Sequence, residues 1–81
     1  MSSPSPQYSK TSELIALGKQ IKELRLARGL SQDALAAASG LERSYIGGIE
    51  RGENNVSLIK LKHVAEALDI TVAELIRRAG F

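Results

Sequence analysis

The stretch from Gln32 to Arg51 constrains the fold of this chain more than any other. Its sequence, QDALAAASGLERSYIGGIER, predicts two short helices joined by a tight turn at Gly40. Glycine suits such a turn because a left-handed backbone costs little without a Cβ atom. The apolar residues on either side fall where two crossed helices must touch: Leu35, Ala36, Leu41, Ile46 and Ile49.

The residues outside this stretch predict three more helices. One begins at residue 11 or 12, carries apolar residues at three- and four-residue spacing, and ends at Gly29. Ser31 is a suitable N-cap for the helix before the turn, and the helix after the turn covers residues 42–50. Ser57 caps the next helix, and Thr71 and Glu74 fit a capping box that starts the last one. We therefore predict an all-α domain of five helices over residues 11–81, preceded by a disordered tail over residues 1–10 that is rich in serine and proline.

The length of the chain predicts one small domain. A domain of 81 residues buries only about 60% of the surface of its unfolded chain, so pairing with a second copy would help to stabilise it. The formal net charge of +2 is too small for a non-specific coat on nucleic acid, so any binding to DNA must depend on where the charges lie.

Several classes of site are excluded by composition. The chain has no cysteine, which excludes disulfides and thiolate zinc sites, and His63 is its only histidine. We find no constellation for acid–base or nucleophilic catalysis and expect no enzymatic activity, no metal and no cofactor. No apolar run approaches the ~20 residues of a membrane helix, and we expect a cytoplasmic protein.

Two helices joined in this way form a helix-turn-helix motif. The sequences on either side of the motif also match one family of such proteins. With its flanks LRLARGLSQ and GIERGENNVSL, the chain resembles the lambda-repressor-like or xenobiotic-response-element-type helix-turn-helix family from Leu17 to Ile76. Within that family, RSYIGGIERGENNVSL is similar to the controller proteins of restriction-modification systems, which are small dimeric regulators. The resemblance implies a lambda-repressor-like fold and a homodimeric transcriptional regulator that binds double-stranded DNA at a near-palindromic operator.

The first turn of the second helix of the motif points at base edges when such a domain binds DNA. We therefore predict Arg43, Ser44 and Tyr45 as base-reading residues, with Arg43 donating to O6 and N7 of a guanine. The alternative is that Arg43 is a solvated residue and Tyr45 packs on the domain surface. Glu42 beside them could accept from a cytosine or hold Arg43 in position.

Two glycines follow inside the same helix, although each is about 1 kcal/mol worse there than alanine. Gly47 and Gly48 either let the backbone approach the groove closely or mark a loose half-helix.

The resemblance also implies contacts with phosphates. The amide of Gln32, at the start of the first helix of the motif, would bind one phosphate. A second clamp would come from the loop before the fourth helix, although each of its members could equally have a simple loop or cap role: Arg51, Asn54, Asn55 and Ser57. The resemblance further pairs Arg25 with Glu50 as a structural ion pair that aims the reading helix.

Apolar residues near the end of the chain exceed what one small core requires. We predict that they form the dimer interface: Ile59, Val72, Ile76 and Phe81. The alternative is that Val72 and Ile76 complete the core of one subunit, with Phe81 left free.

The resemblance to controller proteins implies a mechanism as well. The dimer would regulate its own gene and that of a neighbouring restriction endonuclease, by activation at low occupancy and repression at high occupancy. Glu50, Arg51 and Glu53 would then be candidates for contact with RNA polymerase. The alternative function is an antitoxin-like module that binds a protein and uses DNA only secondarily, which co-purification of a stoichiometric protein partner would favour.

Overall fold

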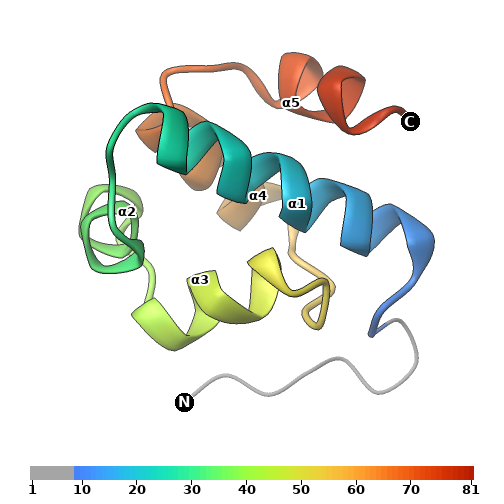
Figure 1. Ribbon diagram of the computed structural model, residues 1–81, viewed down its shortest axis with the longest axis horizontal. Coiled ribbons are helices and arrows are strands. Elements are labelled where there is room, and N and C mark those ends of the chain that lie inside the picture. The colour runs from blue at the N-terminus through green and yellow to red at the C-terminus, as the bar shows by residue number, and fades with distance from the viewer. Residues whose placement is uncertain (1–8) are drawn as a thin grey trace.

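The computed structural model describes residues 9–81, which form five helices and no strand (Figure 1). This confirms the predicted all-α fold. The helices are α1 (Ser12–Ala27), α2 (Gln32–Ser39), α3 (Arg43–Glu50), α4 (Leu58–Ala67) and α5 (Val72–Ala79). Within residues 9–81, no helix combines the length and the apolar character needed to cross a membrane.

The predicted tail over residues 1–10 lies mostly outside the described residues. Of its members, only Ser9 and Lys10 are described, and they form a turn. The backbone N–H of Lys10 donates to the carbonyl oxygen of Gly52 at 2.6 Å, which joins the start of the domain to the end of α3.

Four of the five helices begin at a hydroxyl side chain that accepts a hydrogen bond from the backbone N–H three residues later. These N-caps, with N···O distances of 3.0–3.3 Å, are Thr11, Ser31, Ser57 and Thr71. Each satisfies one of the N–H groups that a helix start leaves unpaired.

Two helix starts differ in detail from the prediction. At α5, the hydroxyl oxygen of Thr71 accepts the backbone N–H of Glu74, which is one of the two hydrogen bonds of a capping box. The carboxylate of Glu74, which would make the other, binds Arg77 and Arg78 instead. The helix α3 starts at Arg43 rather than at residue 42, and its N-cap residue Glu42 makes no side-chain capping bond.

The core lies where α1 passes between α3 and α5 (Figure 1). The helix α2 packs against α3 and α4, and α4 also packs against α5. Gly40, with a φ angle of 72°, is the left-handed turn that crosses α2 over α3. The buried apolar residues are Leu17, Ile21, Leu35, Ala36, Ile46, Ile49, Leu61, Val64, Ala65, Leu68 and Leu75. Ile46 and Ile49 hold α3 against this core, and the first residues of the helix, Arg43 and Ser44, are exposed.

Gly18 sets how closely α1 can approach α3. A Cβ atom at this position would lie 2.2 Å from the carbonyl oxygen of Ile49 and 2.8 Å from that of Glu50. Only glycine allows the two backbones to cross at this distance. No role for Gly18 was predicted from the sequence, although a glycine in the interior of a helix is itself a signal of close backbone approach.

Candidate nucleic-acid interface

The start of α3 presents the first predicted base-reading residues to solvent. Arg43 and Ser44 are both exposed, and the side chain of Arg43 retains 65% of its accessible surface. The Nε atom of Arg43 lies 3.2 Å from Oδ1 of Asp33, which stands in the first turn of α2 and is 78% exposed. Arg43 therefore has a carboxylate partner on the other helix of the motif.

Tyr45 is half-buried and links α3 to the start of α4. The ammonium group of Lys60 lies 4.5 Å from the centre of its ring, and its hydroxyl hydrogen-bonds with the backbone of Ser57. Burial raises the pKa of Tyr45, against the opposing effect of that hydrogen bond. The ring is therefore packed on the domain surface, which is the alternative that sequence analysis left open for it.

The glycine pair in α3 is covered by side chains from beyond the end of the helix. A Cβ atom at Gly48 would lie 2.3 Å from the amide nitrogen of Asn54, and one at Gly47 would lie 3.0 Å from Nη1 of Arg51. Both glycines are buried, and Asn54 is only 4% exposed. The glycines thus make room for Asn54 and Arg51, and a contact between Asn54 and a phosphate would require this loop to shift.

The predicted ion pair between Arg25 and Glu50 is present at the C-terminal end of α3. Nε and Nη2 of Arg25 donate to the two carboxylate oxygens of Glu50 at 2.7 and 3.1 Å, and Nη1 donates to the carbonyl oxygen of Leu30 at 2.7 Å. The two side chains are only 8% and 3% exposed. The hydrogen bond with Glu50 raises the pKa of Arg25, against the effect of burial.

Gln32 takes part in the same cluster. Its amide nitrogen donates to Oε1 of Glu50 at 3.0 Å, so α1, α2 and α3 meet at a single carboxylate. The side chain predicted to bind a phosphate is therefore half-buried and hydrogen-bonded to Glu50 of the same chain. Burial of Glu50 also removes it from the candidates for contact with RNA polymerase, because its side chain offers almost no surface.

The loop between α3 and α4 carries the rest of the predicted phosphate clamp. Arg51 is exposed and pairs with Glu53 at 3.1 Å, while the ammonium group of Lys10 lies 3.9 Å from the same carboxylate. The hydrogen bond from Arg51 lowers the pKa of Glu53 and raises that of Arg51. Asn55 is exposed, and the hydroxyl oxygen of Ser57 accepts the backbone N–H of Lys60.

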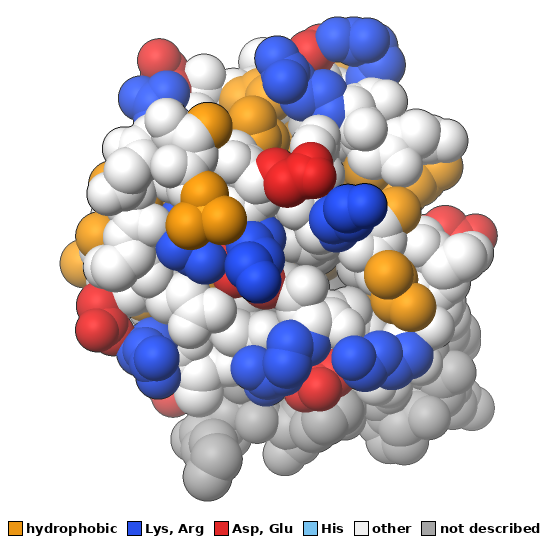
Figure 2. Space-filling view, viewed as in Figure 1, with side chains coloured by type: hydrophobic (Ala, Val, Ile, Leu, Met, Phe, Trp, Pro, Cys, Tyr) orange, Lys and Arg blue, Asp and Glu red, His pale blue; other side chains and the backbone are white. Residues whose placement is uncertain are grey.

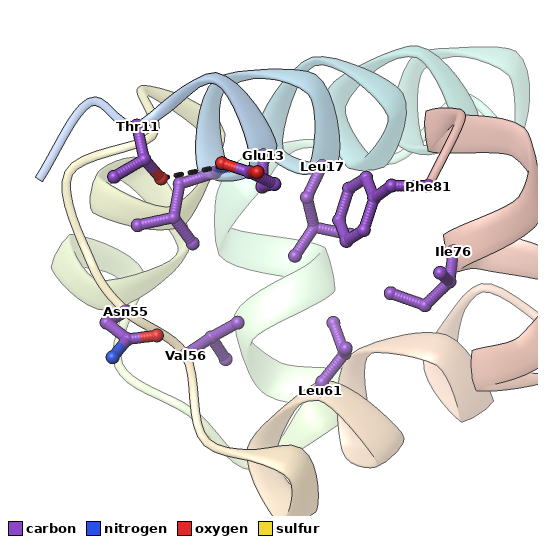
Figure 3. Close-up of a pocket in the computed structure, with 9 residues that line it drawn as sticks. Thr11, Glu13, Leu17, Asn55, Val56, Leu61, Ile76 and Phe81 are labelled. Atoms are coloured by element: carbon purple, nitrogen blue, oxygen red, sulfur yellow. Dashed lines mark hydrogen bonds between the residues drawn. The ribbon is translucent and has the colours of Figure 1, made fainter. Parts of the chain in front are cut away.

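The predicted dimer residues divide into two groups. Ile59 and Phe81 are 63% and 52% exposed, whereas Val72 and Ile76 are partly buried against the core. A groove of about 440 Å³ opens beside Ile76 and Phe81, whose side chains converge with those of α1 and α4 (Figure 3). Its apolar lining is Leu14, Leu17, Val56, Leu61, Ile76 and Phe81.

Charges are mixed rather than segregated on the face that Figure 2 shows, where Lys and Arg side chains are interspersed with carboxylates. A polyanion bound on this face would therefore meet individual cations rather than one continuous basic patch. Among residues 9–81, no group of three or more His, Asp or Glu side chains is placed to hold a metal ion.

Comparison with known proteins supports the resemblance. A helix-turn-helix family model matches residues 21–75. The control protein C.SmaI of Serratia marcescens is 44% identical over 64 residues, which cover 79% of this chain and 76% of that protein. The control protein C.MunI of a Mycoplasma species is 42% identical over 62 residues, which cover 75% and 84%. The crystal structure of the restriction-modification controller protein C.AhdI from Aeromonas hydrophila matches with a TM-score of 0.78 and 52% identity, over 80% of this chain and 98% of that one.

These matches confirm the family resemblance and the narrower similarity to controller proteins. They also agree with the geometry, because residues 21–75 contain both helices of the motif and the loop that follows them. This chain belongs to the helix-turn-helix family and is a DNA-binding transcriptional regulator, not an enzyme.

Proposed function

We propose that this regulator binds a near-palindromic operator as a homodimer and acts by occupying it. The observation that carries the proposal is the exposed start of α3, where Arg43 and Ser44 project from a helix whose other face is fixed in the core. A rigid helix with an exposed first turn is what insertion into a major groove requires.

Arg43 is the principal base-reading residue in this proposal. Its guanidinium group donates to O6 and N7 of a guanine, and Ser44 donates to or accepts from a neighbouring base or phosphate. Tyr45 follows them in the same turn and is half-buried. In this proposal it contacts DNA through the exposed part of its side chain.

Phosphate contacts hold this helix in register. The first backbone N–H groups of α2, starting at Gln32, face one phosphate. A second phosphate is bound by Arg51, Asn55 and Ser57. To bind it, Arg51 leaves its ion pair with Glu53. Asn54 supports this loop from beneath, because its side chain fills the space over Gly48.

A second copy of the chain covers the exposed apolar residues around the groove between α1, α4 and α5. Phe81 lines that groove, whereas Ile59 stands on α4 two residues before the lining residue Leu61 and is not itself part of the lining. Both side chains are large and exposed, which is the property expected of an interface core. Two-fold pairing would set the reading helices about 34 Å apart, matching half-sites one helical turn apart.

The names of the relatives support a narrower role. Several are control proteins, and one solved structure is that of a restriction-modification controller protein. We propose that this chain likewise controls its own gene and a neighbouring restriction endonuclease gene, with activation at low occupancy and repression at high occupancy. Arg51, which is exposed, and Glu53, whose side chain is 25% exposed, are the remaining candidates for contact with RNA polymerase.

Selection of bound duplexes from random DNA tests the operator. We expect a sequence with two-fold symmetry that binds at least about a thousandfold more tightly than random DNA in moderate salt. Equal affinity for the selected and random duplexes would rule out sequence-specific binding.

Sedimentation at micromolar concentration tests the dimer. Ile59→Glu and Phe81→Glu place a charge on exposed positions, so each should leave the subunit folded and yield monomers. Glu23→Gln, on an exposed part of α1, is the control and should remain dimeric. Dimers that persist in both glutamate variants would place the interface elsewhere.

A further inference from the structure

Asp33 is an exposed carboxylate on the same surface as the base-reading residue. It is the second residue of α2, and Arg43 is the first residue of α3. The two side chains meet across the motif, with Nε of Arg43 at 3.2 Å from Oδ1 of Asp33, while both remain mostly exposed. The pair thus stands on the surface that the proposed function turns toward DNA.

We propose that Asp33 is a positioning residue for base recognition, which holds the guanidinium group of Arg43 in the orientation that reads a guanine. This inference rests on the proposed function of Arg43. Guanidinium is planar and carries five N–H donors in a fixed fork. A carboxylate at Nε leaves the two terminal nitrogens as a parallel pair of donors, the arrangement that matches O6 and N7 of guanine.

A carboxylate at this place also limits sequence-independent binding. Without a partner, the long side chain of Arg43 would pair with the nearest phosphate, a contact that carries no sequence information. Asp33 competes with phosphates for Arg43 and repels the DNA backbone in general. Asp33 therefore lowers the affinity for all DNA. At the same time, it increases the ratio of the affinity for the operator to the affinity for other sequences.

A simpler role for Asp33 would be to stabilise α2, because acidic residues are favourable in the first turn of a helix. That role changes the stability of the domain and leaves discrimination between bases unaltered. The two roles are therefore separated by measuring binding to single-base variants of the operator together with thermal unfolding.

The test compares Asp33→Asn with Asp69→Asn, which makes the same change of charge in the link between α4 and α5. The base pair read by Arg43 is first located as the one whose substitution weakens binding by the wild type but not by Arg43→Ala. At that base pair, Asp33→Asn should lose about twofold to fivefold in discrimination, as expected for an exposed ion pair. Its affinity for random DNA should rise, while discrimination at other base pairs and in Asp69→Asn should equal that of the wild type.

Two results would overturn this role. Unchanged discrimination at the base pair read by Arg43, whatever the melting temperature of Asp33→Asn, would leave Asp33 as a residue of the helix start only. An equal loss of discrimination at every base pair would mean that the substitution disturbs the whole DNA-binding surface rather than the orientation of Arg43. Failure of the wild type itself to prefer any duplex would instead remove the proposed function, and is distinguishable because it does not depend on Asp33.

Discussion

The two ends of α3 each carry an arginine–carboxylate pair, and the pairs differ in almost every physical respect. At the C-terminal end, Arg25 and Glu50 are joined by two hydrogen bonds and are less than a tenth exposed. At the N-terminal end, Arg43 and Asp33 make a single 3.2 Å contact and are 65% and 78% exposed. The same two functional groups thus meet once inside the protein and once in water.

This difference assigns the two ends of the helix different tasks. A buried pair loses hydration, so it is stable only where further hydrogen bonds satisfy both groups, as Leu30 and Gln32 do here. An exposed pair is screened by water and contributes only about 0–1 kcal/mol, so it separates readily when another partner arrives. The C-terminal pair therefore holds α3 against α1, and in the proposed function the exposed N-terminal pair is available to DNA.

The largest effect should come from breaking the buried pair. Glu50→Ala leaves the Arg25 guanidinium buried without its partner, which should lower the free energy of unfolding by about 3–5 kcal/mol. Urea denaturation at fixed protein concentration measures this change. Arg43→Ala is the matched variant at the exposed end and should change stability by less than about 0.5 kcal/mol.

A double variant identifies the source of that loss. Arg25→Met combined with Glu50→Ala removes both charges, so it should recover a large part of the stability lost by Glu50→Ala alone. If the double variant were instead less stable than Glu50→Ala, the unpaired charge of Arg25 would not be the cause of the loss.

Gly18 offers a test of the same end of α3 without any change of charge. Gly18→Ala drives a Cβ atom against the backbone carbonyl of Ile49, which cannot move aside as a side chain does. Such overpacking should destabilise the domain by about 1–3 kcal/mol. In the control Gly47→Ala, the added Cβ atom meets only side-chain atoms, namely the end of the flexible Arg51 side chain at 3.0 Å and Oε1 of Gln32 at 3.9 Å. Gly47→Ala should be neutral or should stabilise α3 by up to about 1 kcal/mol, and equal losses in the two variants would contradict this account.

The exposed end of α3 should respond in binding rather than in stability. Arg43→Ala should reduce discrimination between the selected operator and random DNA by about 1–3 kcal/mol for each guanine that the arginine binds. Fluorescence anisotropy titrations with both duplexes at one salt concentration give the ratio directly. An unchanged ratio, with weaker binding to both duplexes, would make Arg43 a phosphate-binding residue.

Sequence reasoning predicted most of the fold and the buried end of α3. Four of the five helices follow from local signals, since Thr11, Ser31, Ser57 and Thr71 each cap a helix with their own side chain, and the turn at Gly40 separates α3 from α2. The pairing of Arg25 with Glu50 came from family resemblance, because nothing local connects residues so far apart in the sequence.

What sequence reasoning missed depends on distances between helices. The roles of Gly18 and Asp33 appear only once α1 and α2 are placed against α3, and the engagement of Gln32 with Glu50 appears only then as well. Asn54 was predicted to bind a phosphate from the loop, whereas its side chain fills the space left by Gly48. For Gln32 and Asn54 the local sequence allowed both an exposed and a packed side chain.

The smallest effect is expected from a third set of ion pairs, on α5, which tests whether exposure alone makes a pair functional. Glu74 binds both Arg77 and Arg78, and these side chains are 32%, 72% and 47% exposed. The hydrogen bond from Arg77, followed by that from Arg78, lowers the pKa of Glu74 below its usual value of 4.5. A lowered pKa means that the pair stabilises the fold above pH 4.5 and that this contribution is lost as the pH falls through the pKa of the folded state.

Glu74→Gln lacks this titration. Its unfolding midpoint in urea should therefore lie slightly below that of the wild type at pH 7 and approach it as the pH falls below the lowered pKa of Glu74. Because α5 contributes no residue to the proposed base-reading surface, discrimination between operator and random DNA should stay unchanged at pH 7. A loss of discrimination in Glu74→Gln would mean that an exposed ion pair affects base reading from anywhere on the domain. The effect of the Arg43–Asp33 pair on discrimination could then not be attributed to its place on the DNA-facing surface.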